Sequence, residues 1–269
     1  MTKKKTKLTP MNELNIAIFK SVQYNSGLTD IGGYKYYFPK TYGEKIKQYL
    51  KSLHVDSKET SKQSLCSASS SARLCTNHHY DDGGKFEVSI HNDVSNVPTK
   101  MDYVIENTLC ECKCQEIVSK KHDYLRSSYC NSKLFKKFDI TNISVEDHKN
   151  RKQEVDYKYL KFSLKDLDVD LPGDYCSINF DVKQLLCHLI AIANEHPDKD
   201  IKKTLKYEIF KPKQEYIDES PALTNLYLEL NEQFKAIINS MKIQNFINHY
   251  NIVIEMEEVF VDTIKEHFI

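Results

Sequence analysis

The sequence lacks the long apolar run that a membrane-spanning helix requires. No stretch of about eighteen apolar residues occurs, and the basic N-terminus MTKKKTKLTPMNEL is not followed by the apolar segment of a secretory signal. We therefore expect a cytoplasmic protein with no membrane partner. A hydrophobic content of 40% can fill a large core. Because neither an internal repeat nor a clear linker is visible, we expect one domain over residues 1–269.

The sequence also lacks any CxxC pair among its eight cysteines. This absence argues against a zinc ribbon, and in a reducing compartment it argues against a disulfide framework. We expect most of these cysteines to be small buried thiols.

The chain has no net charge, but its charges are unevenly distributed. Residues 1–70 contain twelve Lys and five acidic residues, whereas residues 215–269 contain three Lys and ten acidic residues. This segregation fits a basic face for nucleic acid, and it equally fits a solvated basic tail with an acidic C-terminal helix.

Alternation of apolar and polar residues predicts three consecutive strands. KFEVSIH at 85–91 has the pattern of a half-buried strand, and two more strands follow at 101–106 and 108–116 around Asn107. These residues are expected to form a three-stranded antiparallel meander.

Helical spacing of apolar residues predicts the rest of the fold. Helices are expected at 41–56, 65–75, 119–138, 181–196 and 220–242, with strands at 175–180, at 205–212 and from 251 onward. Thr41 and Glu44 form a capping-box pattern, and Asp181 precedes its helix as an N-cap. The succession of elements predicts an α/β fold with a central mixed sheet that contains the meander and is flanked by helices.

The segment MDYVIENTLCECKCQEI separates its cysteines from its charges. Successive side chains of a strand point to opposite faces, so Cys110, Cys112 and Cys114 share one face and Glu111, Lys113 and Gln115 the other. Three cysteines along one straight strand cannot supply four tetrahedral zinc ligands, and they fit a core of small residues better.

The polar face indicates a cation site. Asp102 lies on the preceding strand, where antiparallel pairing can bring it close to Glu111. These carboxylates, the backbone carbonyl of Cys112 and water would form an octahedral oxygen site for Mg²⁺, with Mn²⁺ as the alternative.

Asp102 followed by Glu111-x-Lys113 on two hydrophobic strands resembles the signature of the PD-(D/E)XK nuclease superfamily. The match covers about thirty residues. SSSARLCTNHH and FDVKQLLCHLIAI resemble bacterial restriction-endonuclease-like families of unknown specificity. The resemblance implies a restriction-endonuclease-like fold and Mg²⁺-dependent hydrolysis of phosphodiester bonds in DNA by an endonuclease of restriction or defence type.

The resemblance also implies roles for individual residues. Asp102 and Glu111 would hold the cation, and Lys113 would stabilise the charge that develops on the phosphate rather than act as the base. Glu87 and Glu44 are two further candidates for a metal-binding carboxylate, although a solvent-facing position explains the first and helix capping the second.

Two glutamines are candidates for contacts in the same site. Gln115 would bind water or a phosphate oxygen from the strand of Lys113. Gln184 resembles the glutamine of the Gln-x-x-x-Tyr pattern in RecB-like nucleases, with His188 where that pattern has Tyr.

The segment 119–138 combines basic and aromatic residues directly after the Lys113 strand. We expect Lys120, Lys121 and Arg126 to bind the phosphates of DNA, with RNA as an alternative substrate. Analogy with enzymes that cut both strands of a duplex suggests a homodimer.

Two other functions remain open from the sequence. One is a catalytically silent nucleic-acid-binding protein on the same fold. The other is a cysteine-based metal or redox protein.

Overall fold

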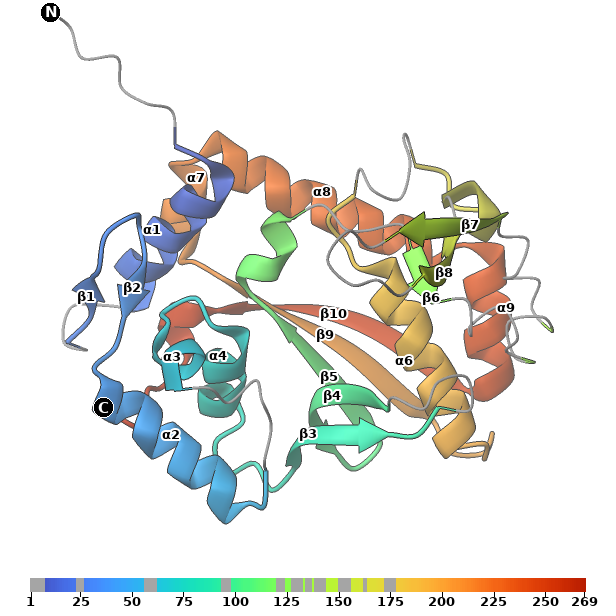
Figure 1. Ribbon diagram of the computed structural model, residues 1–269, viewed down its shortest axis with the longest axis horizontal. Coiled ribbons are helices and arrows are strands. Elements are labelled where there is room, and N and C mark those ends of the chain that lie inside the picture. The colour runs from blue at the N-terminus through green and yellow to red at the C-terminus, as the bar shows by residue number, and fades with distance from the viewer. Residues whose placement is uncertain are drawn as a thin grey trace, which may run out of the picture.

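The computed structural model describes residues 8–22, 27–55, 62–92, 98–119, 124–126, 133, 137, 144–149, 156–161, 164–171 and 178–269. Figure 1 shows how these residues build a central five-stranded sheet with helices on both sides. The fold is therefore α/β with a mixed sheet, as the sequence predicts.

The central sheet has the strand order β10-β9-β5-β4-β3. Strands β3 (Lys85–Ile90), β4 (Thr99–Ile105) and β5 (Thr108–Lys113) form the predicted antiparallel meander. Strand β9 (Lys203–Lys211) pairs in parallel with β5, and β10 (Ile252–Phe260) pairs in parallel with β9. Parallel neighbours need long crossover connections, which contain the C-terminal helices.

Two groups of helices cover the two faces of the sheet (Figure 1). One face carries α6 (Val182–Glu195) and α8 (Pro221–Ile238). The other carries α2 (Lys40–Ser52), α3 (Lys62–Cys66) and α4 (Ser71–His78). Strand β5 lies between these groups, so its alternate side chains meet α6 and α4.

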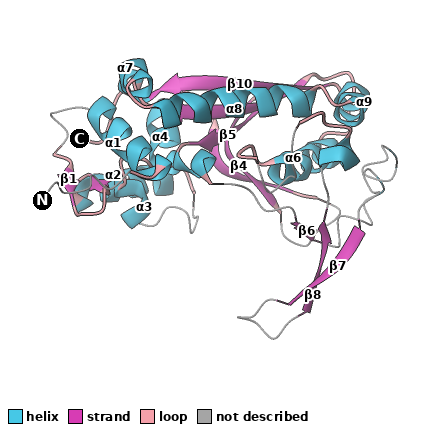
Figure 2. Ribbon diagram, turned by 90° about the horizontal axis from the view of Figure 1, so that it is seen from above, coloured by secondary structure: helices cyan, strands magenta, loops and turns pink. Residues whose placement is uncertain are grey.

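Shorter elements complete the molecule. The remaining helices are α1 (Pro10–Val22), α7 (Gln214–Asp218), α9 (Met241–Tyr250) and the 3₁₀ turns η2 (Gln115–Val118), η4 (Leu164–Leu167) and η6 (Val261–Thr263). The remaining strands are β1 (Thr29–Asp30), β2 (Tyr36–Tyr37), β6 (Tyr124–Arg126), β7 (Ser144–Lys149) and β8 (Asp156–Lys161). Strands β6, β8 and β7 form a second antiparallel sheet, which projects away from the central one in Figure 2.

The apolar core extends along nearly the whole described chain, from Leu14 to Phe268. Helix α6 is deeply embedded, since Leu185, Leu186 and Ile190 are all fully buried, while Lys183 is exposed. An amphipathic helix of this kind buries its wide apolar side against the core. This burial fixes where the polar side chains of α6 can lie.

Several predicted helix boundaries are confirmed. The Asp181 carboxylate caps α6 by accepting a hydrogen bond of 2.9 Å from the Gln184 N–H. Pro221 lies in the first turn of α8, where a missing N–H costs nothing. The predicted helix 220–242 is divided into α8 and α9, because Ser240 starts a new helix by capping Ile243.

Three local predictions are wrong. Helix α2 begins at Lys40 after Pro39 and has no side-chain cap, so Thr41 and Glu44 do not form a capping box. The predicted helix 119–138 is wrong at 124–126, which form strand β6, whereas Lys133 and Lys137 are helical and most of that segment lies outside the described residues. Within the predicted strand 175–180, the described residues 178–180 form a bend before α6.

No helix among the described residues is both long and apolar enough to cross a membrane.

Candidate active site

Three acidic residues lie next to one another across the meander. The antiparallel registers pair Phe86 with Tyr103 and Tyr103 with Cys110, so Glu87, Asp102 and Glu111 each lie one residue from these pairs on adjoining strands. The charges of Glu111 and Glu87 both raise the pKa of Asp102, which places the three carboxylates near one another. The sequence prediction that Asp102 and Glu111 converge is met in the structure, and Glu87 joins them.

Glu111 is the most enclosed of the three carboxylates. Its side chain is only 4% exposed. Its Oε1 accepts hydrogen bonds from the Lys113 Nζ and, at 2.6 Å, from the Gln184 Nε2. Its Oε2 lies 3.6 Å from the His188 Nε2. A buried carboxylate is costly unless it is paired and hydrogen-bonded, and these contacts compensate it.

Asp102 is less completely compensated. Its Oδ2 accepts a hydrogen bond of 2.7 Å from the Cys112 N–H, while among the described residues no hydrogen-bond donor reaches its Oδ1. Burial and the neighbouring charge of Glu111 raise the pKa of Asp102 well above its ordinary value. Crowded carboxylates with raised pKa values gain from a nearby cation, which would favour their ionised forms.

Lys113 is the cation that the chain itself supplies. Burial lowers the pKa of Lys113, but the charges of Glu111 and Asp102 outweigh burial and raise it above its ordinary value. Lys113 is therefore protonated at neutral pH. Its role as an electrostatic stabiliser stays a prediction.

Glu87 sits in a strained part of β3. Its φ of 52° is uncommon for a residue other than glycine, and such conformations cost about 1–3 kcal/mol. Its side chain is 10% exposed, and its Oε2 lies 3.6 Å from the Lys100 Nζ. The Glu87 carboxylate is near enough to Asp102 for its charge to raise the pKa of that residue.

Helix α6 brings two more polar groups to the site. Gln184 and His188 are one helical turn apart, so both reach Glu111 from the same side of the helix. The His188 Nδ1 lies 3.3 Å from the Tyr207 hydroxyl on β9, and burial lowers the pKa of His188. The sequence analysis named His188 through its four-residue spacing from Gln184 but gave no signal for Tyr207, which is 19 positions further along the chain.

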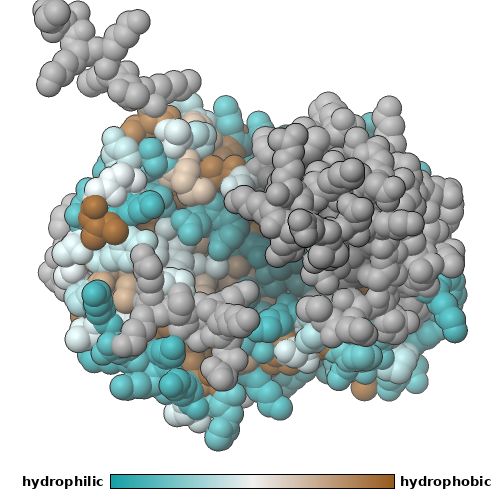
Figure 3. Space-filling view, in the orientation of Figure 1, coloured by the Kyte–Doolittle hydropathy of each residue, from teal (hydrophilic) through white to brown (hydrophobic). Residues whose placement is uncertain are grey.

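The site opens toward solvent at Asp102 and Lys113. Asp102 is partly exposed, and the Lys113 side chain is 18% exposed. A small cavity of about 10 Å³ lies beside Lys113, next to Phe180 and Tyr207. Figure 3 shows hydrophilic surface in the hollow over the central sheet on the viewed face. Asp102 and Lys113 therefore reach the surface, whereas the Glu111 carboxylate that Lys113 contacts is buried.

Three residues that the sequence predicted for the site, Gln115, Glu44 and Cys112, do not add a side chain to the acidic cluster. Gln115 does not share a face with Lys113, because β5 ends at Lys113 and Gln115 begins η2. Its Oε1 instead accepts a hydrogen bond of 3.2 Å from Ser69, so the prediction of a shared strand face is wrong. Glu44 lies on α2, on the other side of the sheet. Cys112 contributes its N–H to Asp102, and metal binding by its carbonyl stays a prediction.

The predicted phosphate-binding residues cannot be placed relative to the acidic cluster. Lys120 and Lys121 lie outside the described residues, and for Arg126 only the backbone position in β6 is described.

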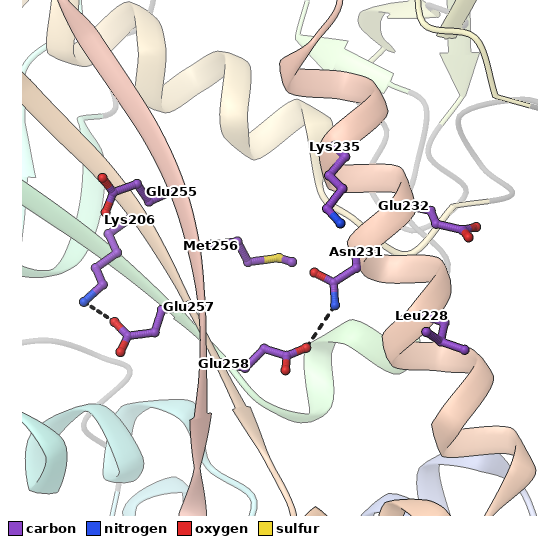
Figure 4. A pocket seen from close by; sticks show the side chains of 9 residues that line it. All are labelled: Lys206, Leu228, Asn231, Glu232, Lys235, Glu255, Met256, Glu257 and Glu258. Atoms are coloured by element: carbon purple, nitrogen blue, oxygen red, sulfur yellow. Dashed lines mark hydrogen bonds and ion pairs between the residues drawn. The ribbon is translucent and has the colours of Figure 1, made fainter.

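A groove lies elsewhere, at the β10 edge of the sheet (Figure 4). Its volume is about 800 Å³, and it runs between β10 and α8. Asn231 donates a hydrogen bond of 3.0 Å to Glu258 across it. Strand β9 separates this edge from β5, so the groove is not part of the acidic cluster.

Comparisons with protein-family models, with curated proteins and with solved structures gave no match to this chain. The functional argument therefore depends on the geometry of the site.

Proposed function

We propose that this protein is a metal-dependent nuclease of the restriction-endonuclease-like fold that hydrolyses phosphodiester bonds in DNA. The observation that carries the proposal is the alignment of Glu87, Asp102 and Glu111 on three adjoining strands, with Lys113 beside them. A random placement of charged residues on a sheet would not gather three acids and one amine on a mostly buried face, because burying them costs free energy.

The residues fit a hard divalent cation such as Mg²⁺ or Mn²⁺. Asp102 and Glu111 would hold it through carboxylate oxygens, with Glu87 as a third ligand, and oxygen ligands are those that Mg²⁺ prefers. The Asp102 oxygen that accepts no hydrogen bond within the described part of the chain, and the raised pKa of that carboxyl, support this fit. A bound cation of this kind lowers the pKa of water and neutralises charge on a phosphate.

The remaining side chains have roles that follow from their contacts. Lys113, protonated and partly exposed, would donate to a phosphate oxygen and stabilise the negative charge that develops there. Gln184 holds Glu111 in position through its hydrogen bond of 2.6 Å. His188 supports Glu111 from the buried side.

Supercoiled plasmid tests this proposal directly. The wild type is incubated with plasmid in Mg²⁺, in Mn²⁺ and in EDTA, beside Asp102→Asn and a control, Glu229→Gln, which changes an exposed acid on α8. We expect nicked or linear DNA with the wild type and the control in the presence of metal, and none with Asp102→Asn or in EDTA.

Two results would contradict the proposal. Cutting that persists in EDTA and in Asp102→Asn would show that the acidic cluster is not the catalytic site. Binding of DNA or RNA without cleavage of either, in both metals, would identify a catalytically silent nucleic-acid-binding protein.

A further inference from the structure

A second polar cluster lies on the opposite face of β5, beneath α4. Strands β5 and β9 pair in parallel with Cys112 beside Glu208. Cys75 and His79 are four residues apart at the end of α4, so they project together from one side of that helix. All four residues are buried, and Glu208 is completely so.

The ligand atoms of this cluster are already close together. One sulfur or nitrogen atom from each of Cys75, His79 and Cys112 lies within 4.8 Å of the other two. The Glu208 Oε2 lies 2.8 Å from the His79 Nε2 and 3.5 Å from the Cys112 Sγ. In a tetrahedral zinc site with bonds of about 2.0–2.3 Å, ligand atoms are separated by about 3.3–3.8 Å. Glu208 comes within 4.8 Å of His78 and His79 but does not join both cysteines in one such group, so shifts of the Cys75 or Glu208 side chain would be needed to bring all four ligand atoms to these separations.

The surroundings of His79 are those of a metal-binding histidine. Its Nδ1 lies 3.1 Å from an Asp82 carboxylate oxygen. A carboxylate in this position holds the proton on Nδ1 and leaves Nε2 to bind a metal, which is the usual outer-shell arrangement of zinc sites. The second oxygen of Glu208, Oε1, is buried without a hydrogen bond, although the Lys206 Nζ lies 3.4 Å from it.

We propose that Cys75, His79, Cys112 and Glu208 bind one Zn²⁺ ion in a closed, structural site. Two sulfurs, one imidazole nitrogen and one carboxylate oxygen are a donor set for zinc and not for Mg²⁺. Four protein ligands and full burial leave no open position for substrate, which separates this site from the acidic cluster on the other face.

The competing arrangement is a buried ion pair without a metal. In that form His79, Lys206 and the Cys112 thiol compensate Glu208, and both thiols keep their protons, since burial raises the pKa values of Cys75 and Cys112. Zinc binding would replace the two thiol protons, and the bound ion would compensate Glu208 more completely.

The site would fix the strand on which the candidate catalytic residues stand. Cys112 lies between Glu111 and Lys113, so an ion bound to it would link β5 to β9 and to α4. A rigid support beneath the acidic face would hold those two side chains in place. The zinc site is independent of nuclease activity and can be tested without DNA.

Metal analysis of the full-length chain is the first experiment. The protein, freed of any affinity tag, is expressed with zinc in the medium, and its zinc content is measured by mass spectrometry. We expect about one zinc per chain, and a cobalt-substituted sample should show sulfur-to-cobalt charge-transfer absorption with tetrahedral visible bands. Cys75→Ser and Cys112→Ser should lose most of the zinc.

Matched variants separate this site from others. Cys114→Ser changes an equally buried cysteine just beyond the same strand, and Asp102→Asn changes the acidic face; both should keep their zinc. Wild-type protein without zinc, or zinc retained by Cys75→Ser and Cys112→Ser, would overturn the proposal. If those two variants do not fold, the cobalt spectrum of the wild type decides: absence of the sulfur charge-transfer band would refute zinc binding by these cysteines.

Discussion

Replacing Lys113 with methionine tests whether its charge compensates the buried acids. The change keeps most of the side-chain volume and leaves Glu111, which is 4% exposed, without its ammonium partner. Removing one partner of a buried ion pair costs about 3–5 kcal/mol. Because Gln184 still donates to Glu111 and the Lys113 side chain is 18% exposed, we expect the lower end, about 3 kcal/mol.

Thermal unfolding followed by circular dichroism in EDTA measures this loss. A loss of about 3 kcal/mol should lower the Tm by about 6–12 °C for a chain of this size. Two variants serve as controls. Lys213→Met removes an ion pair with Glu215 in which both side chains are more than 40% exposed, and should leave the Tm close to that of the wild type. The double variant Glu111→Gln with Lys113→Met should recover most of the lost stability, because the buried carboxylate that Lys113 contacts is then replaced by a neutral amide.

The reasoning is refuted if Lys113→Met unfolds within about 1 °C of the wild type in EDTA. It is also refuted if the double variant is less stable than Lys113→Met alone, since the amine would then not act through Glu111.

Further outcomes follow from other contacts. Asp102→Asn should raise the Tm in EDTA at neutral pH and abolish stabilisation by Mg²⁺. Because the pKa of Asp102 is raised in the folded protein, its ionised form lowers the stability of the wild type at pH values above the ordinary pKa of an aspartate. The stability advantage of Asn should therefore shrink as the pH falls through the raised pKa. Gln184→Ala removes a charged hydrogen bond worth about 1.5–3 kcal/mol and should slow plasmid cleavage by about 10–100-fold without loss of the fold. Arg73→Met should cost about 3–5 kcal/mol in urea unfolding, because the fully buried Arg73 pairs with Glu266. A cleavage rate unchanged in Gln184→Ala, or an unfolding midpoint unchanged in Arg73→Met, would contradict these contacts.

The meander and the acidic pair could be read from the sequence because both depend on local rules. The period of two fixes which side chains of a strand share a face, and short connections make neighbouring strands antiparallel. Asp102, Glu111 and Lys113 therefore came together as expected. The same rule failed for Gln115, because a 3₁₀ turn ended the strand two residues earlier than the alternation suggested.

Contacts between distant segments could not be read in this way. Gln184 was a candidate only through a family resemblance, and its bond to Glu111 spans 73 positions of the chain. Glu208 is 129 residues from His79, and nothing in either local sequence indicates that they meet. The cysteine face was expected to be a core of small residues, whereas Glu208 and His79 make part of it polar.

The sequence by itself determined the α/β class, the meander, the capped helix α6 and the separation of the β5 side chains into an acidic and a thiol face. Each of these follows from backbone periodicity over a few residues. The tertiary structure alone decided what those two faces meet: α6 completes the acidic cluster, and α4 with β9 completes the cysteine–histidine cluster. These contacts form because helices pack on both faces of the sheet. That packing depends on the burial of apolar surface throughout the chain, which no local pattern specifies.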